Sequence, residues 1–283
     1  MNHFSSFACG KIILSGEYAV VFGYPGIAVP SKETITITLE KIDNCKLKIE
    51  NSIEWPDVPK PWLKYAEKIV RLATNNLKEM PRGVLRIKTD LPLGKGMGSS
   101  TALVIALCRC LLGNDCRKEA LEIENELNPD HSGLDFAVIW EEKPIYFRKG
   151  VAPKPINLPA NLLKESRLID TGTPNETTPE LVAWVRSRCE LPITPATGAP
   201  RPGYGEKTNT RTAIEIIGRC ADRILSGESL ESVFHDHHRA QVALGVVTPE
   251  AQKIIAGIEE KGGAAKVLGA GARTGGGGMI LEI

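Results

Sequence analysis

The residues of this sequence best suited to chemistry form a glycine-rich stretch, PLGKGMGSSTA, at positions 92–102. Glycine lets a backbone turn its N–H groups inward and approach a ligand closely. The helix predicted to follow would point its positive dipole end at the same place. The pattern is typical of a phosphate-binding loop, although it matches neither the Walker A nor the Rossmann sequence. The alternative interpretation is a turn that only caps a buried helix.

Secondary-structure patterns place this loop between a strand and a helix. Residues 83–90 alternate between apolar and polar side chains and predict a strand, whereas residues 99–112 are apolar almost all round and predict a buried helix that ends at Gly113. The alternating runs 34–39 and 45–50 predict a β-hairpin. Other predicted helices cover residues 62–73, 117–127, 179–190, 210–226, 229–244 and 250–261, and other predicted strands cover residues 168–172, 264–268 and 279–283.

A proline-rich stretch in the middle of the chain marks the predicted domain boundary. A chain of 283 residues is long enough for two domains, and three prolines interrupt residues 150–159. We therefore expect an N-terminal domain over residues 1–155 and a C-terminal domain over residues 156–283. Residues 191–205 contain four prolines and three glycines. They predict a surface loop that is either a mobile lid or an inert connection.

The composition favours a cytoplasmic protein that acts on small molecules. Hydrophobic residues make up 42% of the chain, and 35 basic residues nearly balance 34 acidic ones, so no global field attracts nucleic acid or a membrane. No apolar run is long enough to span a bilayer, and the N-terminus lacks a signal-peptide pattern. The seven cysteines include no Cys-x-x-Cys pair, so we expect small buried side chains rather than disulfides or a zinc site.

Three ordered stretches of the sequence resemble one enzyme family. They are GKIILSGEYAVV at 10–21, the glycine-rich loop at 92–102, and KVLGAG at 266–271 followed by the glycines at 275–278. In this order they resemble the three motifs of the GHMP kinases, a family that includes galactokinase, homoserine kinase, mevalonate kinase and phosphomevalonate kinase. The resemblance covers nearly the whole chain, because the motifs lie near both ends and in the middle.

Shorter segments resemble the mevalonate kinase branch of this family, namely SGLD at 132–135, TTPELV at 177–182 and ALGV at 243–246. The resemblance implies an α+β, two-domain GHMP kinase fold with the active site in the interdomain cleft, and by analogy a homodimer. It implies transfer of the γ-phosphoryl group of ATP, with Mg²⁺, to an alcohol, which in this branch is mevalonate and gives 5-phosphomevalonate. The alternatives are another GHMP kinase, acting on phosphomevalonate or a sugar, and a catalytically silent nucleotide-binding homologue.

Phosphoryl transfer requires a phosphate cradle, a metal site and a group that orients the attacking hydroxyl. The resemblance assigns the nucleotide to one set of residues: Pro92, Gly94, Lys95, Gly96, Met97, Gly98, Ser99, Ser100 and Thr101. A hydroxyl of Ser99 or Ser100 is expected to bind Mg²⁺, and helix N-capping is the alternative role for both. Glu124 is the predicted metal carboxylate, because it precedes Asp135 by the spacing seen in the family. Its alternative is a solvated helix face.

The resemblance also implies a catalytic pair. Asp135 follows a glycine in a predicted turn and is expected to accept the proton of the substrate hydroxyl as general base. Lys11, in the first motif, is the matching cation and would polarise that hydroxyl. For an isolated aspartate in a turn, the alternative is an Asx-turn.

The substrate side is expected to use residues of the first and third motifs together with one threonine. This set is Glu17, Tyr18, Thr178, Gly269, Ala270 and Gly271. Tyr18 stands where familiar mevalonate kinases have histidine, so it either donates a hydrogen bond to substrate or packs as an aromatic side chain. The alternative for Thr178 is a helix cap. Residues 272–274 lengthen the third motif, where Arg273 either binds an anion or remains solvated.

Three histidines, His235, His237 and His238, lie together on one predicted helix. Two of them would share a helix face, as metal ligands do. We instead expect this group to be the polar side of an amphipathic helix, because magnesium does not favour imidazole.

Overall fold

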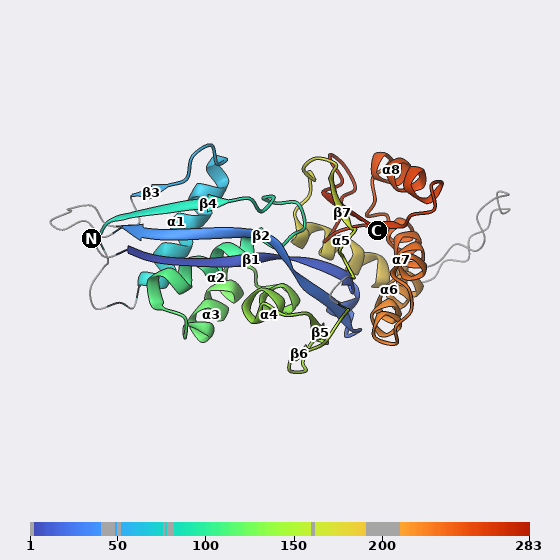
Figure 1. The fold of residues 1–283 in the computed structure, drawn as a ribbon, viewed down its shortest axis with the longest axis horizontal. Coiled ribbons are helices and arrows are strands. Elements are labelled where there is room, and N and C mark those ends of the chain that lie inside the picture. Colours follow the sequence, from blue (N-terminus) through green and yellow to red (C-terminus); the bar gives the residue numbers. More distant parts are fainter. Residues whose placement is uncertain are drawn as a thin grey trace. The chain divides into compact units, whose positions relative to one another are not determined.

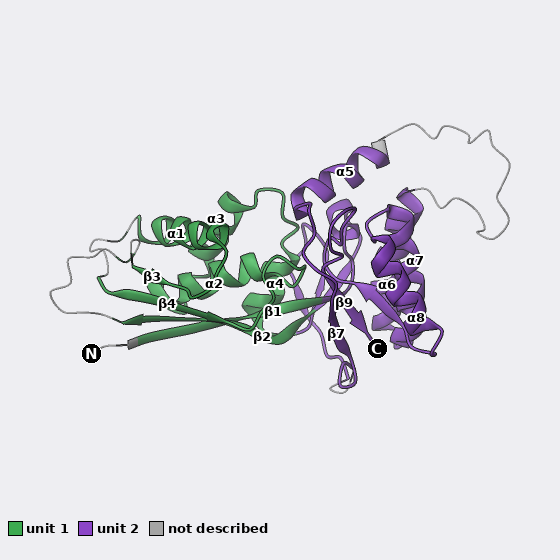
Figure 2. Ribbon diagram, turned by 90° about the horizontal axis from the view of Figure 1, so that it is seen from above, with its two compact units in different colours: residues 1–12, 29–143 green, residues 13–28, 144–283 purple. Residues whose placement is uncertain are grey.

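The computed structural model describes residues 3–40, 49, 52–75, 77, 82–159, 162–190 and 210–283. Over this part of the chain helices and strands are mixed, so the expected α+β class is confirmed (Figure 1). The chain forms two compact units, residues 1–12 with 29–143 and residues 13–28 with 144–283 (Figure 2). The chain passes from one unit to the other within its first strand and returns within its second. The division at residues 155 and 156 stays a prediction.

The larger sheet has six strands: β1 (His3–Ser15), β2 (Gly26–Glu40), β3 (Ile53–Glu54), β4 (Val84–Thr89), β5 (Ile145–Phe147) and β6 (Lys154–Pro155). Its order is β3-β4-β2-β5-β6, and β1 also pairs with β2. The antiparallel register of β2 and β4 sets Ile35 opposite Thr89 and Leu39 opposite Leu85. Ile35, Ile37 and Leu39 are buried, because alternate side chains of a strand share one face.

The unit with most of this sheet includes four helices in its described residues: α1 (Lys60–Thr74), α2 (Ser99–Leu112), α3 (Arg117–Leu127) and α4 (Leu134–Glu141). Helices α1, α2 and α3 lie on one face of the strands (Figure 2). The α2 helix is buried along most of its length, as its apolar sequence predicts, and it ends at Gly113, whose φ is 92°. It begins where the glycine-rich loop ends, so the core fixes the position of that loop.

Besides β5, β6 and the adjoining ends of β1 and β2, the described part of the second unit contains one short 3-10 helix, four α-helices and a three-stranded sheet of order β7-β9-β8. These elements are η1 (Ala19–Phe22), β7 (Arg167–Asp170), α5 (Thr178–Glu190), α6 (Thr210–Leu225), α7 (Leu230–Leu244), α8 (Pro249–Glu259), β8 (Ala265–Val267) and β9 (Met279–Glu282). Side-chain caps start two of the helices. The Oγ atom of Ser229 accepts a hydrogen bond from the N–H of Ser232, and Thr248 caps Ala251 in the same way, with Pro249 at the first helical position.

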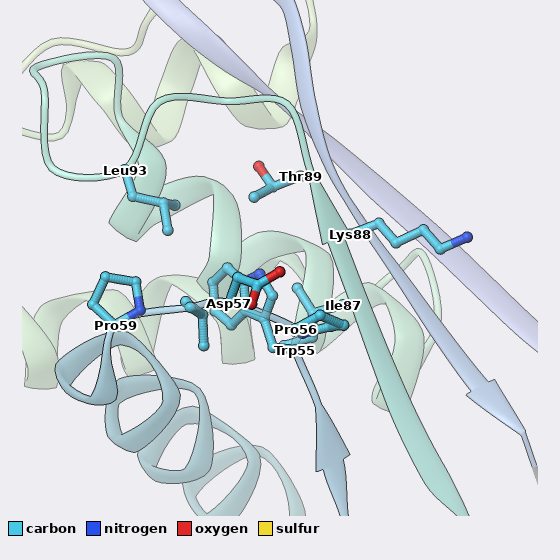
Figure 3. Close-up of a pocket in the computed structure, with 9 residues that line it drawn as sticks. Trp55, Pro56, Asp57, Pro59, Ile87, Lys88, Thr89 and Leu93 are labelled. Atoms are coloured by element: carbon cyan, nitrogen blue, oxygen red, sulfur yellow. The ribbon is translucent and has the colours of Figure 1, made fainter.

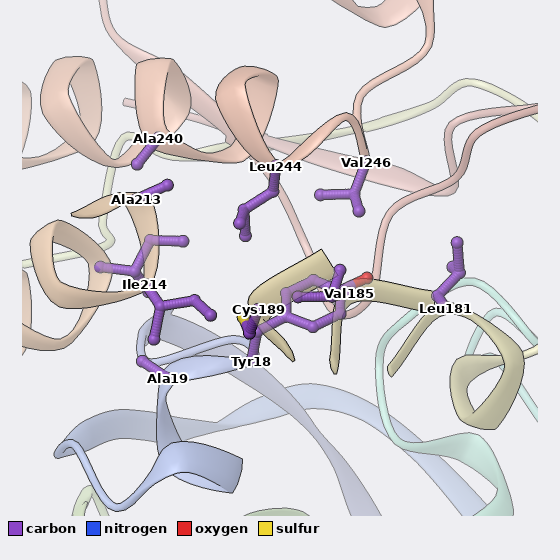
Figure 4. Packing of buried hydrophobic residues seen from close by; sticks show 11 residues of the cluster. Tyr18, Ala19, Leu181, Val185, Cys189, Ala213, Ile214, Ala240, Leu244 and Val246 are labelled. Carbon is purple, nitrogen blue, oxygen red and sulfur yellow. The ribbon is translucent and has the colours of Figure 1, made fainter. Parts of the chain in front are cut away.

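A cluster of apolar side chains holds the helices of this unit together. Tyr18 and Ala19 pack with Leu181 and Val185 of α5, and Leu244 at the end of α7 belongs to the same cluster (Figure 4). Residues near the start of the chain therefore form one core with elements close to its end. This packing brings the first and third glycine-containing motifs near each other.

Some expectations are corrected, and others fall outside the described residues. Residues 134–141 form α4, whereas the sequence suggested that the predicted turn continued as far as Asp135. The second strand of the predicted hairpin, over 45–50, and the predicted loop over 191–205 lie outside the described residues apart from Ile49. The six described cysteines are buried, which confirms their expected packing role. Among the described residues, every helix is too short or too polar to cross a bilayer.

Candidate active site

The glycine-rich loop connects β4 to α2 and takes a backbone shape that glycine adopts most easily. Gly94, Gly96 and Gly98 have φ angles of 70°, 83° and 75°, in the left-handed region. A Cβ atom at Gly98 would lie 2.9 Å from Cγ of Lys11 and 3.0 Å from Cδ1 of Ile139. The loop therefore passes close to Lys11 before it enters the N-terminus of α2, where the helix dipole favours an anion.

The other predicted nucleotide contacts lie in this loop or in the first turn of α2. The carbonyl oxygen of Met97 accepts a 2.9 Å hydrogen bond from the N–H of Lys11. Ser99 is buried, and its Oγ accepts a 3.0 Å hydrogen bond from the N–H of Gly94, which closes the loop. Gly98 occupies the N-cap position without a side-chain cap, so the helix-cap interpretation of the serines is wrong. Three further residues of this set are partly buried: Pro92, Lys95 and Ser100.

Lys11 and Asp135, the predicted catalytic pair, form an ion pair. The Nζ atom of Lys11 lies 3.2 Å from Oδ1 of Asp135, with the lysine side chain 3% exposed and the aspartate side chain 36% exposed. Asp135 lies in the first turn of α4, where the helix dipole favours a carboxylate, and not in the Asx-turn considered from sequence. The exposed part of the carboxylate can receive a proton from a hydroxyl, next to the buried positive charge of Lys11.

Glu124 is 1% exposed, so the interpretation as a solvated helix face is wrong. Its Oε1 accepts hydrogen bonds from Oγ1 of Thr101 at 2.9 Å and from Nδ2 of Asn128 at 3.1 Å. Its Oε2 is buried without a hydrogen-bond partner among the described residues. Burial raises the pKa of this carboxyl to about 7. A buried carboxylate oxygen without a partner fits a hard cation such as Mg²⁺, which prefers oxygen ligands.

Glu17, predicted on the substrate side, is buried with two partners from the C-terminal part of the chain. Its Oε1 accepts a hydrogen bond from Nζ of Lys266, which also donates to the carbonyl oxygen of Ile13 at 2.9 Å. Its Oε2 lies 3.0 Å from Nε2 of His237. Burial alone would raise the pKa of Glu17, but Lys266 and His237 outweigh burial and lower it to about 2. Glu17 is therefore an ionised carboxylate inside the protein.

Tyr18 takes the packed position that was one of its two predicted roles. Tyr18 is 5% exposed and lies in the apolar cluster of this unit (Figure 4). Its hydroxyl donates a hydrogen bond to the carbonyl oxygen of Ala270. Its φ of 64° is in a region that residues with a Cβ rarely adopt. Like the hydrogen bonds of Lys266 with Glu17 and Ile13, that of Tyr18 links the first motif directly to the third.

The remaining predicted substrate residues lie at the start of α5 and in the third motif. Thr178 is exposed, and the capping role considered for it belongs to Thr177, whose N–H and hydroxyl donate to Oε2 of Glu180 at 2.7 and 2.8 Å. Gly269 and Gly271 have φ angles of 66° and 65°. A Cβ atom at Gly271 would lie 2.1 Å from the carbonyl oxygen of Val246, so only glycine fits there.

The inserted residues of the third motif are anchored to α5 and to the loop before it. The backbone N–H groups of Arg273 and Thr274 donate to Oε2 of Glu176 at 3.2 and 3.3 Å. The guanidinium carbon of Arg273 lies 4.2 Å from the centroid of the Trp184 ring, and that of Arg188 lies 4.7 Å from it. Arg273 is thus exposed but stacked, a state between the two predicted roles.

The histidine group differs from its prediction. His237 is fully buried and His238 is 8% exposed, so the two lie on the core side of α7 and not on a polar surface. His235 is partly exposed and pairs with Oε1 of Glu259 at 2.7 Å. A lysine within an apolar strand, as Lys266 is in β8, was the sequence signal that could have indicated a buried charged partner for one of these residues.

A pocket next to the glycine-rich loop was also not predicted (Figure 3). Its volume is about 320 Å³, and it extends from the segment before α1 to the end of β4 and the loop. Its lining residues are Trp55, Pro56, Asp57, Val58, Pro59, Ile87, Lys88, Thr89 and Leu93. Trp55 and the aliphatic lining residues give the pocket an apolar part, and Asp57, Lys88 and Thr89 add polar groups. Such a pocket can accommodate a flat ring system.

Comparison with known proteins shows which kinases this chain resembles. Residues 64–141 match the family model described as the GHMP kinases N terminal domain. Curated mevalonate kinases from Archaeoglobus fulgidus and Pyrococcus furiosus are each 27% identical to this chain over 98% of its length, and the matches cover 90% and 87% of those proteins.

Solved structures show the same fold. The mevalonate kinase of Methanococcus jannaschii superimposes with a TM-score of 0.74 at 20% identity, covering 100% of this chain and 90% of that one. The mevalonate kinase of L. major, solved in complex with R-mevalonate, also has a TM-score of 0.74 at 20% identity, covering 98% of this chain and 86% of that one. This chain therefore carries a GHMP kinase N-terminal domain at residues 64–141 and is similar to mevalonate kinases over nearly its whole length, which supports an ATP-dependent small-molecule kinase.

Proposed function

We propose that this protein is a mevalonate kinase, which transfers the γ-phosphoryl group of ATP to the primary hydroxyl of mevalonate and yields 5-phosphomevalonate and ADP. The observation that carries the proposal is the ion pair of Lys11 and Asp135 next to Gly98, at the entrance to α2. It joins a proton acceptor, a positive charge and a phosphate-binding loop in one place. Sequence similarity to mevalonate kinases over 98% of the chain supports this choice of acceptor.

The nucleotide would use the glycine-rich loop and the pocket beside it. Backbone N–H groups of residues 94–98 and the start of α2 would bind the phosphates. The base would enter the pocket lined by Trp55 and Leu93, because that pocket includes a residue of the loop itself. In this arrangement the apolar part of the pocket contacts the base, and the glycine-rich loop binds the charged phosphates.

Magnesium would be held by oxygen ligands of α2 and α3. Ser99 or Ser100 would supply a hydroxyl, and Glu124 would supply the carboxylate oxygen Oε2, which has no partner among the described residues. The bound ion would neutralise charge on the phosphate oxygens during transfer. These residues lie on rigid helices, so they hold their positions before the nucleotide binds.

The transfer step requires one group that accepts the hydroxyl proton and one group that orients the substrate hydroxyl. The oxygen of the substrate hydroxyl attacks the γ-phosphorus, the bond to the bridging oxygen of ADP breaks, and the hydroxyl proton passes to Asp135. Lys11 would place positive charge beside the attacking oxygen. The other proposed acceptor contacts are Glu17, Tyr18, Thr178, Gly269, Ala270 and Gly271, of which the first two are tied to the third motif.

One observation favours a second acceptor within the same family. The hydroxyl of Tyr18 is already bonded to Ala270, and it stands at a position where a histidine is familiar in mevalonate kinases. Phosphomevalonate or a sugar is therefore the second candidate acceptor.

The test is a coupled ADP-release assay with mevalonate, phosphomevalonate, homoserine and galactose as separate acceptors. We expect release with mevalonate at a kcat/KM at least tenfold above that for any other. Faster turnover of another acceptor would replace mevalonate, and nucleotide binding without turnover of any of them would point to a silent homologue.

A further inference from the structure

The contacts of Glu124 are asymmetric. Its Oε1 receives two hydrogen bonds, from the hydroxyl of Thr101 and from the side-chain amide of Asn128. Its Oε2 receives none from the described residues, although the side chain is almost completely buried. A carboxylate kept only for packing would have both oxygens satisfied, because each unpaired buried acceptor costs about 1–3 kcal/mol.

The side chain of Asn128 is held in one orientation. Its Nδ2 donates to Oε1 of Glu124 at 3.1 Å and to the hydroxyl oxygen of Tyr65 at 3.3 Å, so both amide hydrogens have acceptors. Its backbone N–H donates to the carbonyl oxygen of Glu124 at 2.8 Å, which ends α3 at this residue. The ring of Tyr65 packs edge-on against Trp62, with 6.0 Å between centroids. Asn128 therefore has little freedom to rotate.

Thr101 approaches Glu124 from another helix. It is the third residue of α2, immediately after the two serines proposed to bind magnesium, and it is 3% exposed. Its hydroxyl donates to the same oxygen that Asn128 engages. Donors from α2 and from the end of α3 thus converge on one oxygen of the carboxylate, and the other oxygen is left for a ligand.

We propose that Thr101 and Asn128 are positioning residues for the magnesium site, which hold Glu124 through Oε1 and leave Oε2 to bind the metal. The inference rests on the proposed function, because it takes Glu124 as the metal ligand. Neither residue touches substrate or nucleotide in this role. The two act by fixing the rotation of the carboxylate, so that binding the ion costs little reorganisation.

The test measures metal binding directly, by electron paramagnetic resonance of free Mn²⁺ in the presence of saturating ADP. Thr101→Val keeps the shape of the side chain and removes the donor, and Asn128→Leu removes the second donor. Each is expected to weaken Mn²⁺ binding by about tenfold, as loss of a partner behind a metal ligand does. Thr101→Ser restores the hydroxyl and should bind Mn²⁺ as tightly as the natural protein.

A matched control is Thr74→Val. Thr74 is also buried in a helix, but its hydroxyl donates to the carbonyl oxygen of Val70, 2.8 Å away, and it does not contact Glu124. This variant should lose stability to a similar extent and bind Mn²⁺ normally. If Thr101 were only structural, its valine variant would behave in the same way as the control.

The outcomes separate this inference from the proposed function. Unchanged Mn²⁺ affinity in folded Thr101→Val and Asn128→Leu, with the natural protein active on mevalonate, overturns the inference alone. Weakened Mn²⁺ binding in both variants, with no turnover of mevalonate by the natural protein, supports the inference and overturns the proposed acceptor. Unchanged Mn²⁺ affinity in Glu124→Gln would show that Glu124 is not a metal ligand, and this overturns the inference.

Discussion

Asp135 is the residue on which the proposed reaction most directly depends, because it is the partly exposed member of a pair whose cation is buried. The substitution Asp135→Asn keeps the shape and removes the proton acceptor. We expect kcat to fall by about 10²- to 10⁴-fold, the usual contribution of a general base, while ADP binding stays close to that of the natural protein. The melting temperature should fall, because the buried ammonium of Lys11 loses its carboxylate partner.

The control for this prediction is Asp130→Asn, which removes an exposed aspartate from the loop that precedes α4. It should leave kcat unchanged. Steady-state kinetics with mevalonate and calorimetric titration with ADP measure both quantities. Turnover of Asp135→Asn within threefold of the natural rate would exclude this residue as the base.

Lys266 is expected to have a structural role, because its ammonium pairs with the buried carboxylate of Glu17. In Lys266→Met, Glu17 would keep its carboxylate inside the protein without its main cation. Breaking a buried pair in this way costs about 3–5 kcal/mol. We expect a loss of that size in the free energy of unfolding measured with urea, and partial recovery in the double variant with Glu17→Gln.

Lys261→Met is the matched control for this loss. Lys261 is exposed and lies near the start of the same strand, so the free energy of unfolding should change by less than about 0.5 kcal/mol. A loss as small as this in Lys266→Met would show that the pair with Glu17 contributes little.

The sequence indicated the candidate site residues more accurately than it indicated their burial and their contacts. Glu124 and His237 each carry a polar group that a helical pattern places on a solvated face, and both are buried. Their burial depends on partners from other elements, such as Thr101 for Glu124 and Glu17 for His237. Spacing along one helix contains no information about such partners.

At the scale of elements, the glycine-rich loop makes the sharpest prediction. Gly98 and Gly113 flank α2, and both have positive φ, 75° and 92°. A Cβ at Gly98 would lie 2.9 Å from Lys11, whereas a Cβ at Gly113 would meet no atom within 4 Å. We expect Gly98→Ala to lose about 1–2 kcal/mol of stability, because its backbone is left-handed. Gly113→Ala should lose at least as much, because a φ of 92° with a ψ of 174° is a conformation that only glycine adopts readily.

Only Gly98→Ala should lose function, because only there does the new methyl group displace Lys11, the proposed catalytic lysine. We expect its kcat/KM for ATP to fall at least tenfold and that of Gly113→Ala to stay within twofold. Equal losses of kcat/KM in the two variants would mean that the loop acts through stability alone.

The success of element prediction followed the strength of the local signal. Helix α3 begins and ends where its pattern predicts, and the predicted bounds of α2 agree as well. In contrast, β1 was not predicted, because its apolar residues do not alternate and Gly10 interrupts them. The eight-residue helix α4 is too short and too apolar to show a helical period, so Asp135 was assigned to a turn.

At the scale of the whole molecule, the first motif contributes to both compact units. Lys11 belongs to the unit that contains the glycine-rich loop, whereas Glu17 and Tyr18 belong to the unit that contains the third motif. Within each unit the motif has a direct partner there, Asp135 in one and Lys266 in the other. A single continuous segment therefore takes part in both halves of the proposed machinery.

The second unit should make the whole protein sensitive to acid. Burial lowers the pKa of His238 to about 4 and, with help from Lys266, lowers the pKa of His237, whereas an unfolded histidine has a pKa of 6.5. Below pH 6.5 these two histidines therefore bind protons in the unfolded chain before they do so in the folded protein. Stability should be complete above pH 6.5 and fall as the pH drops toward 4, by at most about 1.4 kcal/mol per pH unit for each histidine.

Glu17 extends this sensitivity to lower pH. Its pKa is about 2 in the folded protein and 4.5 in the unfolded chain, so its contribution to stability is complete above pH 4.5 and is lost between 4.5 and 2.

Urea unfolding at pH 7.5, 6, 5 and 4 measures how steeply the free energy of unfolding falls over the range in which the histidines act. Between pH 6 and 4 the free energy of unfolding of His238→Gln should fall less steeply than that of the natural protein. The variant lacks one histidine that binds a proton only in the unfolded chain. A free energy of unfolding that stays level from pH 7.5 to 4 would mean that these histidines accept protons in the folded state.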